Sequence, residues 1–148
     1  FYDGEKVKTC RAVNSFTTTV QGKGDSYKKC KIIDCMDLIA DDLTTAIEDD
    51  YLGKYANSYD NKCVLISAIK MYLKQLNIDG IVADDFSVDF DIEAIKAYLI
   101  GGGKYTEEEL AAMDDTAIVK LDTGSRVMLK ANVTILDAME DVDLPIAI

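Results

Sequence analysis

The chain has 148 residues, of which 49% are hydrophobic and none is histidine, and a formal net charge of −11 at pH 7. This length suffices for one domain with a sizeable core, while the lack of histidine excludes catalytic sites of the Ser-His and Cys-His kinds. The acidic balance argues against a nucleic-acid partner, which requires a basic surface, and the apolar runs are too short to predict a membrane span.

The charge is unevenly distributed along the chain. Residues 1–31 carry seven Lys or Arg and three Asp or Glu, a local charge of +4, which leaves −15 for the remainder. In an assembly of identical copies, the basic end of one copy could therefore meet the acidic flank of the next. A solvated surface that keeps the protein soluble explains the same charges equally well, and both interpretations stay open.

The first residue and the cysteines bear on the origin of the chain. It starts with Phe1 and shows no basic leader followed by an apolar run, so we expect a fragment cut from a longer protein. The cysteine spacings match no zinc framework, and we expect reduced, partly buried thiols in a cytosolic protein with no metal or other cofactor. The four cysteines are Cys10, Cys30, Cys35 and Cys63.

The first predicted elements are a strand and a helix. Residues 6–20 are rich in Thr and Val, which favours one bent strand or two short ones. Asp25 or Ser26 then offers a side-chain cap for a helix. Apolar residues spaced by three and four from Ile32 onward predict that this helix buries one stripe and ends near Asp50.

A second amphipathic helix is predicted over residues 62–76. Because a polar connection joins it to the first helix, we expect the two helices to pack antiparallel. Gly80 follows as a left-handed cap. Residues 81–85 then form a short strand or an extended segment.

Two shorter helices follow. Asp89 or Asp91 is expected to cap a helix over residues 92–100, which ends at three consecutive glycines, residues 101–103. Residues 106–109 have the pattern of a capping box, in which a Thr and a Glu three positions later satisfy each other's backbone amides. The helix that this box starts is expected to end by residue 113.

The last part of the chain changes to period-two alternation, which is typical of half-buried strands. Residues 117–121 and 126–136 predict a hairpin around the tight turn at 122–125. With residues 6–20, this predicts an α+β fold, with helices packed on one face of a mainly antiparallel sheet built from the N- and C-terminal strands. The apolar face of the last strand comprises Val127, Leu129, Ala131, Val133 and Ile135.

After residues 137–140 the apolar residues occupy even positions, which predicts a second strand with its own apolar face. Pro145 lacks an amide donor and favours an edge position there. Since no later strand of the chain pairs with it, we predict an assembly strand that docks on another molecule. Its apolar residues are Val142, Leu144, Ile146 and Ile148.

Two other functions stand as alternatives. The turn Asp122-Thr123-Gly124-Ser125 follows apolar residues, as in aspartic proteases, and a homodimer would bring two such carboxylates together. A turn in which the Asp caps local amides explains the same residues without catalysis. A calcium-dependent binding module is the second alternative, although the EF-hand ligand order is missing and a capped helix start explains the same cluster. That cluster comprises Asp84, Asp85, Asp89, Asp91 and Glu93.

Several blocks, in order along nearly the whole chain, give it a family resemblance. The chain resembles the C-terminal domain of contractile tail sheath proteins of phages, prophages and bacteriocins. Each block is short, and the ordered set is the specific signal. The blocks are residues 11–18 (RAVNSFTT), 33–39, 51–57 (YLGKYAN), 69–80, and 123–127 (TGSRV) running into 136–141 (LDAMED).

The resemblance implies a structural role without enzyme activity. Sheath subunits of this family stack around a tail tube and stay linked by terminal arms that add strands to sheets of neighbouring subunits. The implied partners are other sheath subunits and the tube protein, with no nucleic acid or membrane, in a virion tail assembled in the bacterial host cytoplasm. On this basis residues 1–136 form the sheath domain and residues 137–148 a linker and arm. The expected inter-subunit arm residues are Asp137, Glu140, Asp141, Val142, Asp143, Leu144, Pro145, Ile146 and Ile148.

Overall fold

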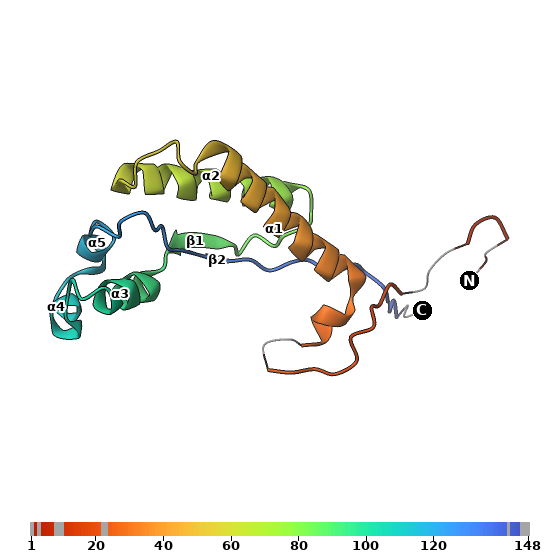
Figure 1. Ribbon diagram of the computed structural model, residues 1–148. Coiled ribbons are helices and arrows are strands. Elements are labelled where there is room, and N and C mark those ends of the chain that lie inside the picture. The colour runs from red at the N-terminus through yellow and green to blue at the C-terminus, as the bar shows by residue number, and fades with distance from the viewer. Residues whose placement is uncertain (1, 3, 8–10, 22–23, 142, 146–148) are drawn as a thin grey trace.

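The computed structural model describes residues 2, 4–7, 11–21, 24–141 and 143–145. Two long helices run in opposite directions along one side of a two-stranded sheet, and three short helices gather near one end of the strands (Figure 1). The elements are α1 (Cys30–Asp50), α2 (Tyr59–Ile78), β1 (Ser87–Phe90), α3 (Ile92–Gly101), α4 (Glu107–Ala111), α5 (Asp115–Ile118) and β2 (Leu129–Asn132). The α+β class and the antiparallel arrangement of the two long helices are confirmed.

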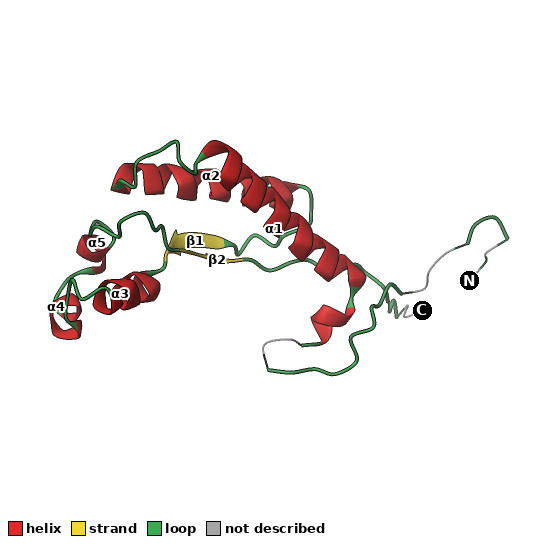
Figure 2. Ribbon diagram, in the orientation of Figure 1, coloured by secondary structure: helices red, strands yellow, loops and turns green. Residues whose placement is uncertain are grey.

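The sheet joins two segments that lie far apart in the sequence (Figure 2). β1 and β2 pair antiparallel, with Val88 opposite Ala131. Less regular pairing continues beyond the strands, where the Leu136 amide donates to the carbonyl of Ile81 at 2.8 Å. The predicted extended segment over residues 81–85 is therefore present, and it places Leu136 next to the C-terminal end of α2.

The first hydrophobic core lies between the sheet and the two long helices. α2 contributes Leu73, which is fully buried, and the sheet side contributes the fully buried Val82 and Val88. α1 covers this core less tightly, since its residues Ile39 and Leu43 are only partly buried. One stripe of each amphipathic helix thus closes the same core, as their periodicity predicts.

The second core lies within the three short helices. Leu99 of α3, Leu110 of α4 and Ile118 of α5 are all at most 1% exposed. Phe90, at the end of β1, packs against both cores. This lobe is therefore fixed to the end of the sheet by a shared aromatic side chain.

The predicted helix ends are largely confirmed. Asp91 caps α3, because its side chain accepts a hydrogen bond from the Ala94 amide at 3.0 Å. α4 begins with the full capping box, in which Thr106 and Glu109 bond each other's backbone amides. Gly80 has a φ of +72°, the left-handed conformation expected directly after α2.

The predicted N-terminal strand is wrong. Among the described residues of the 6–20 segment, Val7 and Val13 make only isolated bridges, and none belongs to the sheet. Neither Asp25 nor Ser26 caps α1, because both lie in a short 3-10 helix (Asp25–Lys28) and Lys29 is the residue that precedes α1. The physical reason is that the extended segment pairs with the entrance of α1 instead of with a strand.

The predicted hairpin of residues 117–121 with 126–136 is also wrong. The apolar run at 117–121 does not pair with β2; Ile118 ends α5, and the adjacent Val119 is buried in the second core. β2 instead pairs with β1, a strand that was not predicted because acidic residues surround it. Two successive apolar residues can be buried in a short helix as well as in a strand, so periodicity alone does not decide the secondary structure of this short run.

Candidate functional site at the terminal junction

Both terminal segments meet at the N-terminal end of α1 (Figure 1). The Asn14 amide donates to the Lys28 carbonyl at 2.8 Å, and the Cys30 amide donates to the Ala12 carbonyl at 3.1 Å. These bonds hold residues 12–14 antiparallel to residues 28–30. They fix the chain that precedes α1 against the first residue of that helix.

Ion pairs join these two segments. Arg11 Nη2 lies 2.5 Å from an Asp141 oxygen, and Arg11 Nε lies 3.8 Å from Glu140. Lys29 Nζ lies 3.3 Å from Glu140 and also pairs with Asp137. We call these five side chains the terminal clamp. It brings together three of the predicted arm residues, Asp137, Glu140 and Asp141.

The electrostatics of the terminal clamp are those of a surface network. The hydrogen bond from Lys29 holds the pKa of Asp137 below its ordinary value of 3.8. The same bond raises the pKa of Lys29 above 10.5. Because its side chains remain partly exposed to solvent, the network is weak and sensitive to salt. It can therefore orient the segment that follows without fixing it permanently.

The predicted arm residues after the terminal clamp lie in solvent. Leu144 is 78% exposed, Asp143 and Pro145 are also exposed, and none of the three lies in a strand. Val142, Ile146 and Ile148 lie outside the described residues. The arm's docking on a neighbour therefore stays a prediction.

The clamp cations were missed by the site prediction. Arg11 and Lys29 belong to the basic first 31 residues, for which the sequence left open a contact with an acidic neighbour. In this structure both pair with the acidic residues of their own chain. The signal in the sequence was that residues 1–31 and residues 137–141 carry net charges of opposite sign. Such charges attract two segments of one chain as well as two copies of it.

The sheet offers an open edge to another strand. In an antiparallel ladder, successive residues point their amides alternately toward and away from the partner. The carbonyl of Met128 points toward β1, because it accepts a hydrogen bond from the Asp91 amide at 3.2 Å. The backbone amides and carbonyls of Leu129 and Ala131 therefore point away from β1, toward the open edge. Within the described part of the chain no further strand covers this edge. A two-stranded sheet is marginal by itself and gains from a third strand.

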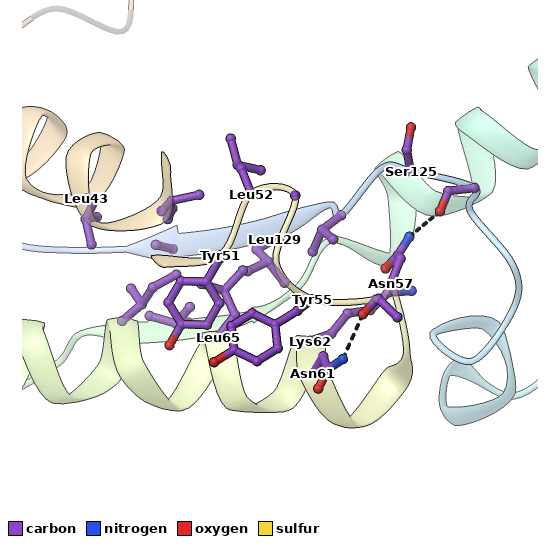
Figure 3. A pocket seen from close by; sticks show the side chains of 18 residues that line it. Leu43, Tyr51, Leu52, Tyr55, Asn57, Asn61, Lys62, Leu65, Ser125 and Leu129 are labelled. Carbon is purple, nitrogen blue, oxygen red and sulfur yellow. Dashed lines mark hydrogen bonds between the residues drawn. The ribbon is translucent and has the colours of Figure 1, made fainter. Parts of the chain in front are cut away.

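Two grooves follow the apolar face of this strand segment. The larger, about 780 Å³, lies between residues 124–131 and the loop that joins α1 to α2; we call it the sheet groove (Figure 3). The smaller, about 560 Å³, includes Ile32, Val133 and Ile135. Ala131 lines both grooves, so the two grooves together extend along most of the odd-numbered apolar face, from Val127 to Ile135. That face was predicted to be buried, and Val127 remains 41% exposed on it.

The turn at residues 122–125 is built by local hydrogen bonds. Asp122 accepts from the Gly124 amide at 2.8 Å and from Lys104 Nζ at 3.2 Å, and these two bonds hold its pKa below 3.8. Gly124 has a φ of +64°, which favours glycine. These contacts are those of the structural turn that competes with the protease interpretation.

The acidic residues of the calcium alternative have separate partners. Asp85 accepts a hydrogen bond from Thr134, Asp89 pairs with Lys70, and Asp91 caps α3. Within residues 2, 4–7, 11–21, 24–141 and 143–145, no three His, Cys, Asp or Glu side chains are placed to hold a metal ion. Three of the cysteines, Cys30, Cys35 and Cys63, are free thiols, and Cys10 lies outside the described residues.

No helix in the described part of the chain combines the length and apolarity that crossing a membrane requires.

Comparison with known proteins identifies similar sequences. The family model described as the phage tail sheath C-terminal domain matches residues 22–148. The chain is also 34% identical, over 139 residues, to the tail sheath protein of Clostridium phage phiCD119. That alignment covers 94% of this chain but only 38% of the relative, so the chain spans well under half of the relative's length.

Proposed function

Because the chain belongs to the phage tail sheath C-terminal domain family, we propose that it is the C-terminal part of a contractile sheath subunit. The subunit polymerises around a tail tube by exchanging terminal strands with its neighbours. Its role is structural and not enzymatic, in a virion tail that assembles in the bacterial host cytoplasm. Its partners are other sheath subunits and the tube protein.

The terminal clamp supports a boundary between domain and arm. Residues 1–136 would form the domain, because Leu136 is the last of the described residues whose amide bonds to the sheet region. Residues 137–148 would form the linker and arm, starting at Asp137 in the terminal clamp. The clamp would then set the direction in which the arm leaves its own subunit.

One observation carries the proposal: an exposed segment with apolar residues and an uncovered sheet edge occur in the same chain. Leu144 is 78% exposed, while the outer edge of β2 has no strand beside it in the described part. An arm strand from one copy would complete the sheet of another. The odd-numbered face and its two grooves would receive its side chains.

The energetics of one arm favour a lattice over a dimer. Burying an apolar side chain contributes about 1.5 to 3 kcal/mol, while ordering each residue of the arm costs about 1 to 2 kcal/mol. A single docked arm is therefore marginal. In a closed helical lattice each subunit is held by several arms at high effective concentration, which makes the assembly stable.

The test is deletion of residues 138–148 from the full-length subunit. We expect the circular dichroism spectrum and the melting temperature to change little, while electron microscopy finds no helical tubes. A matched control replaces residues 142–148 by Gly and Ser, which keeps the arm's length and removes its apolar face, and it should fail in the same way. Normal tubes from either variant would refute arm exchange.

A further inference from the structure

The sheet groove contains a largely buried lysine side chain. Lys62, near the start of α2, is only 6% exposed and lines this groove (Figure 3). Within the described part of the chain its ammonium makes no ion pair or hydrogen bond. Asp122 attracts it electrostatically, but that carboxylate is bonded to Lys104 at 3.2 Å. Burial lowers the pKa of Lys62, as expected for a desolvated cation.

A buried acceptor lies in the lining of the same groove. Asn57 Nδ2 donates to the carbonyls of Gly124 and Arg126 at 2.7 and 3.1 Å, and to Thr123 Oγ1 at 3.2 Å. Two carbonyl partners fix which end of the amide is the nitrogen, because a carbonyl cannot donate. Asn57 Oδ1 is buried, and no donor reaches it within the described residues.

An unpaired donor and an unpaired acceptor in one groove indicate that a bound partner satisfies them. Buried polar groups are nearly always hydrogen-bonded, and buried charges are paired, because desolvation is costly. The remaining lining is mostly apolar and includes Leu65, Val127 and Leu129. The matching ligand is an extended peptide that offers a carboxylate to Lys62, a backbone amide to Asn57 Oδ1, and apolar side chains to the walls.

We propose that the sheet groove binds residues 141–145 of the arm of a second copy, with Lys62 pairing with the carboxylate of Asp143. This inference rests on the proposed function. Asp143 is exposed and has no ion pair within the described residues, whereas Asp137 and Asp141 are held in the terminal clamp of their own chain. Leu144 and Pro145, both exposed, follow it directly.

The arm of the same copy does not reach this site while the terminal clamp is closed. The clamp holds Glu140 beside Lys29, the residue directly before α1. The groove is lined by Ile47, which lies about 25 Å along α1 from the first residue of that helix. Asp143 follows Glu140 by three residues, which span at most about 11 Å. With the clamp closed, the carboxylate must therefore come from another subunit.

The test is binding of a fluorescent peptide with the sequence of residues 137–148 to the full chain, followed by fluorescence anisotropy. Lys62→Met keeps the apolar stem and removes the charge, and we expect it to weaken binding about tenfold or more, since a buried charge-assisted hydrogen bond is lost. The peptide with Asp143→Asn should lose the same factor. Combined, the two changes should lose little more than either alone, because they remove one interaction.

Two controls keep this test decisive. Lys74→Met removes the same charge from an exposed position on α2 and should leave binding unchanged. Lys62→Met should not lower the melting temperature of the free chain, because desolvation already disfavours the charge of Lys62, so weaker binding cannot be attributed to unfolding.

The outcomes separate the two proposals. Binding that is insensitive to both changes would overturn the role of Lys62 and leave arm exchange intact. Dependence on Lys62 but not on Asp143 would also overturn the assignment, in favour of another acidic segment as the occupant. No binding of the wild-type peptide, even at about the millimolar concentration that tethering supplies, would contradict the groove assignment, and the tubes formed by the deletion variant would then decide arm exchange separately.

Discussion

The lobe of α3, α4 and α5 and the terminal junction differ in what holds them together. The lobe buries Leu99, Leu110 and Ile118 almost completely within one chain. The junction relies on exposed ion pairs, and Leu144 lies in solvent beyond it. The lobe buries its core within one chain, whereas in the proposed function the junction and the β2 edge serve contacts with another copy. Changes in the lobe should therefore act on stability, and changes at the junction on assembly.

The largest expected effect comes from opening the lobe's core. Leu99→Ala deletes most of a fully buried side chain and should lower the free energy of unfolding by about 2 to 5 kcal/mol. Urea denaturation measures this directly. The neighbouring Ile100 is 41% exposed, so Ile100→Ala is the matched control and should cost much less. Equal losses would mean that the lobe is not the tightly packed part of the molecule.

A smaller effect is expected from the helix cap within the same lobe. Thr106→Ala removes the side chain that accepts from the Glu109 amide and should cost about 1 kcal/mol. Thr106→Ser retains the hydroxyl and should restore most of that stability. Thermal denaturation of the two variants provides the comparison. A Ser variant as unstable as the Ala variant would assign the loss to the methyl group and not to the cap.

At the junction we expect a local effect and little change in global stability. Lys29→Met removes the cation that pairs with Asp137 and Glu140. Hydrogen exchange over residues 137–141 should become faster, while the unfolding midpoint moves little, because exposed ion pairs contribute little to stability. Lys31→Met, two residues later, removes the same charge without an ion pair to the arm among the described residues and is the charge-matched control. A large fall in the midpoint would show that the terminal clamp is part of the core structure.

The smallest effect is the pH dependence of the terminal clamp. Since Lys29 lowers the pKa of Asp137, the clamp's contribution is fully present above about pH 3.8 and is lost as the pH falls through the lower folded pKa. Since Asp137 raises the pKa of Lys29, the contribution is also lost as the pH rises beyond 10.5. Carboxyl carbon NMR should find that Asp137 titrates below 3.8, and closer to 3.8 in Lys29→Met. Identical titration in both proteins would contradict this pairing.

Helices were predictable from the sequence wherever spacing and cap chemistry agreed. The Asp91 cap, the box between Thr106 and Glu109, and the turn at Gly80 are local arrangements that need only nearby residues. β1 was not predictable, because Asp89 within it and Asp91 directly after it match a helix start as well as a strand. Its partner β2 lies about 40 residues away, and only the folded chain shows that pairing.

The candidate site was predictable only in part. The acidic start of the arm, residues 137–141, could be recognised from its charge and from the change of the apolar alternation that follows it. Its partners Arg11 and Lys29 required the fold, which brings residue 11 next to residue 141. Lys62 gave no signal at all, because a lysine on an amphipathic helix is expected to be exposed, and only the surrounding loop and strand bury it.

The central claim is that the arm of one subunit completes the sheet of another. Cryo-electron microscopy of tubes assembled from the full-length subunit tests it most directly. We predict density for residues 141–148 alongside the outer edge of β2 in a neighbouring subunit, with Asp143 next to that neighbour's Lys62. An arm that packs on its own subunit, or a β2 edge that remains uncovered in the tube, would contradict it.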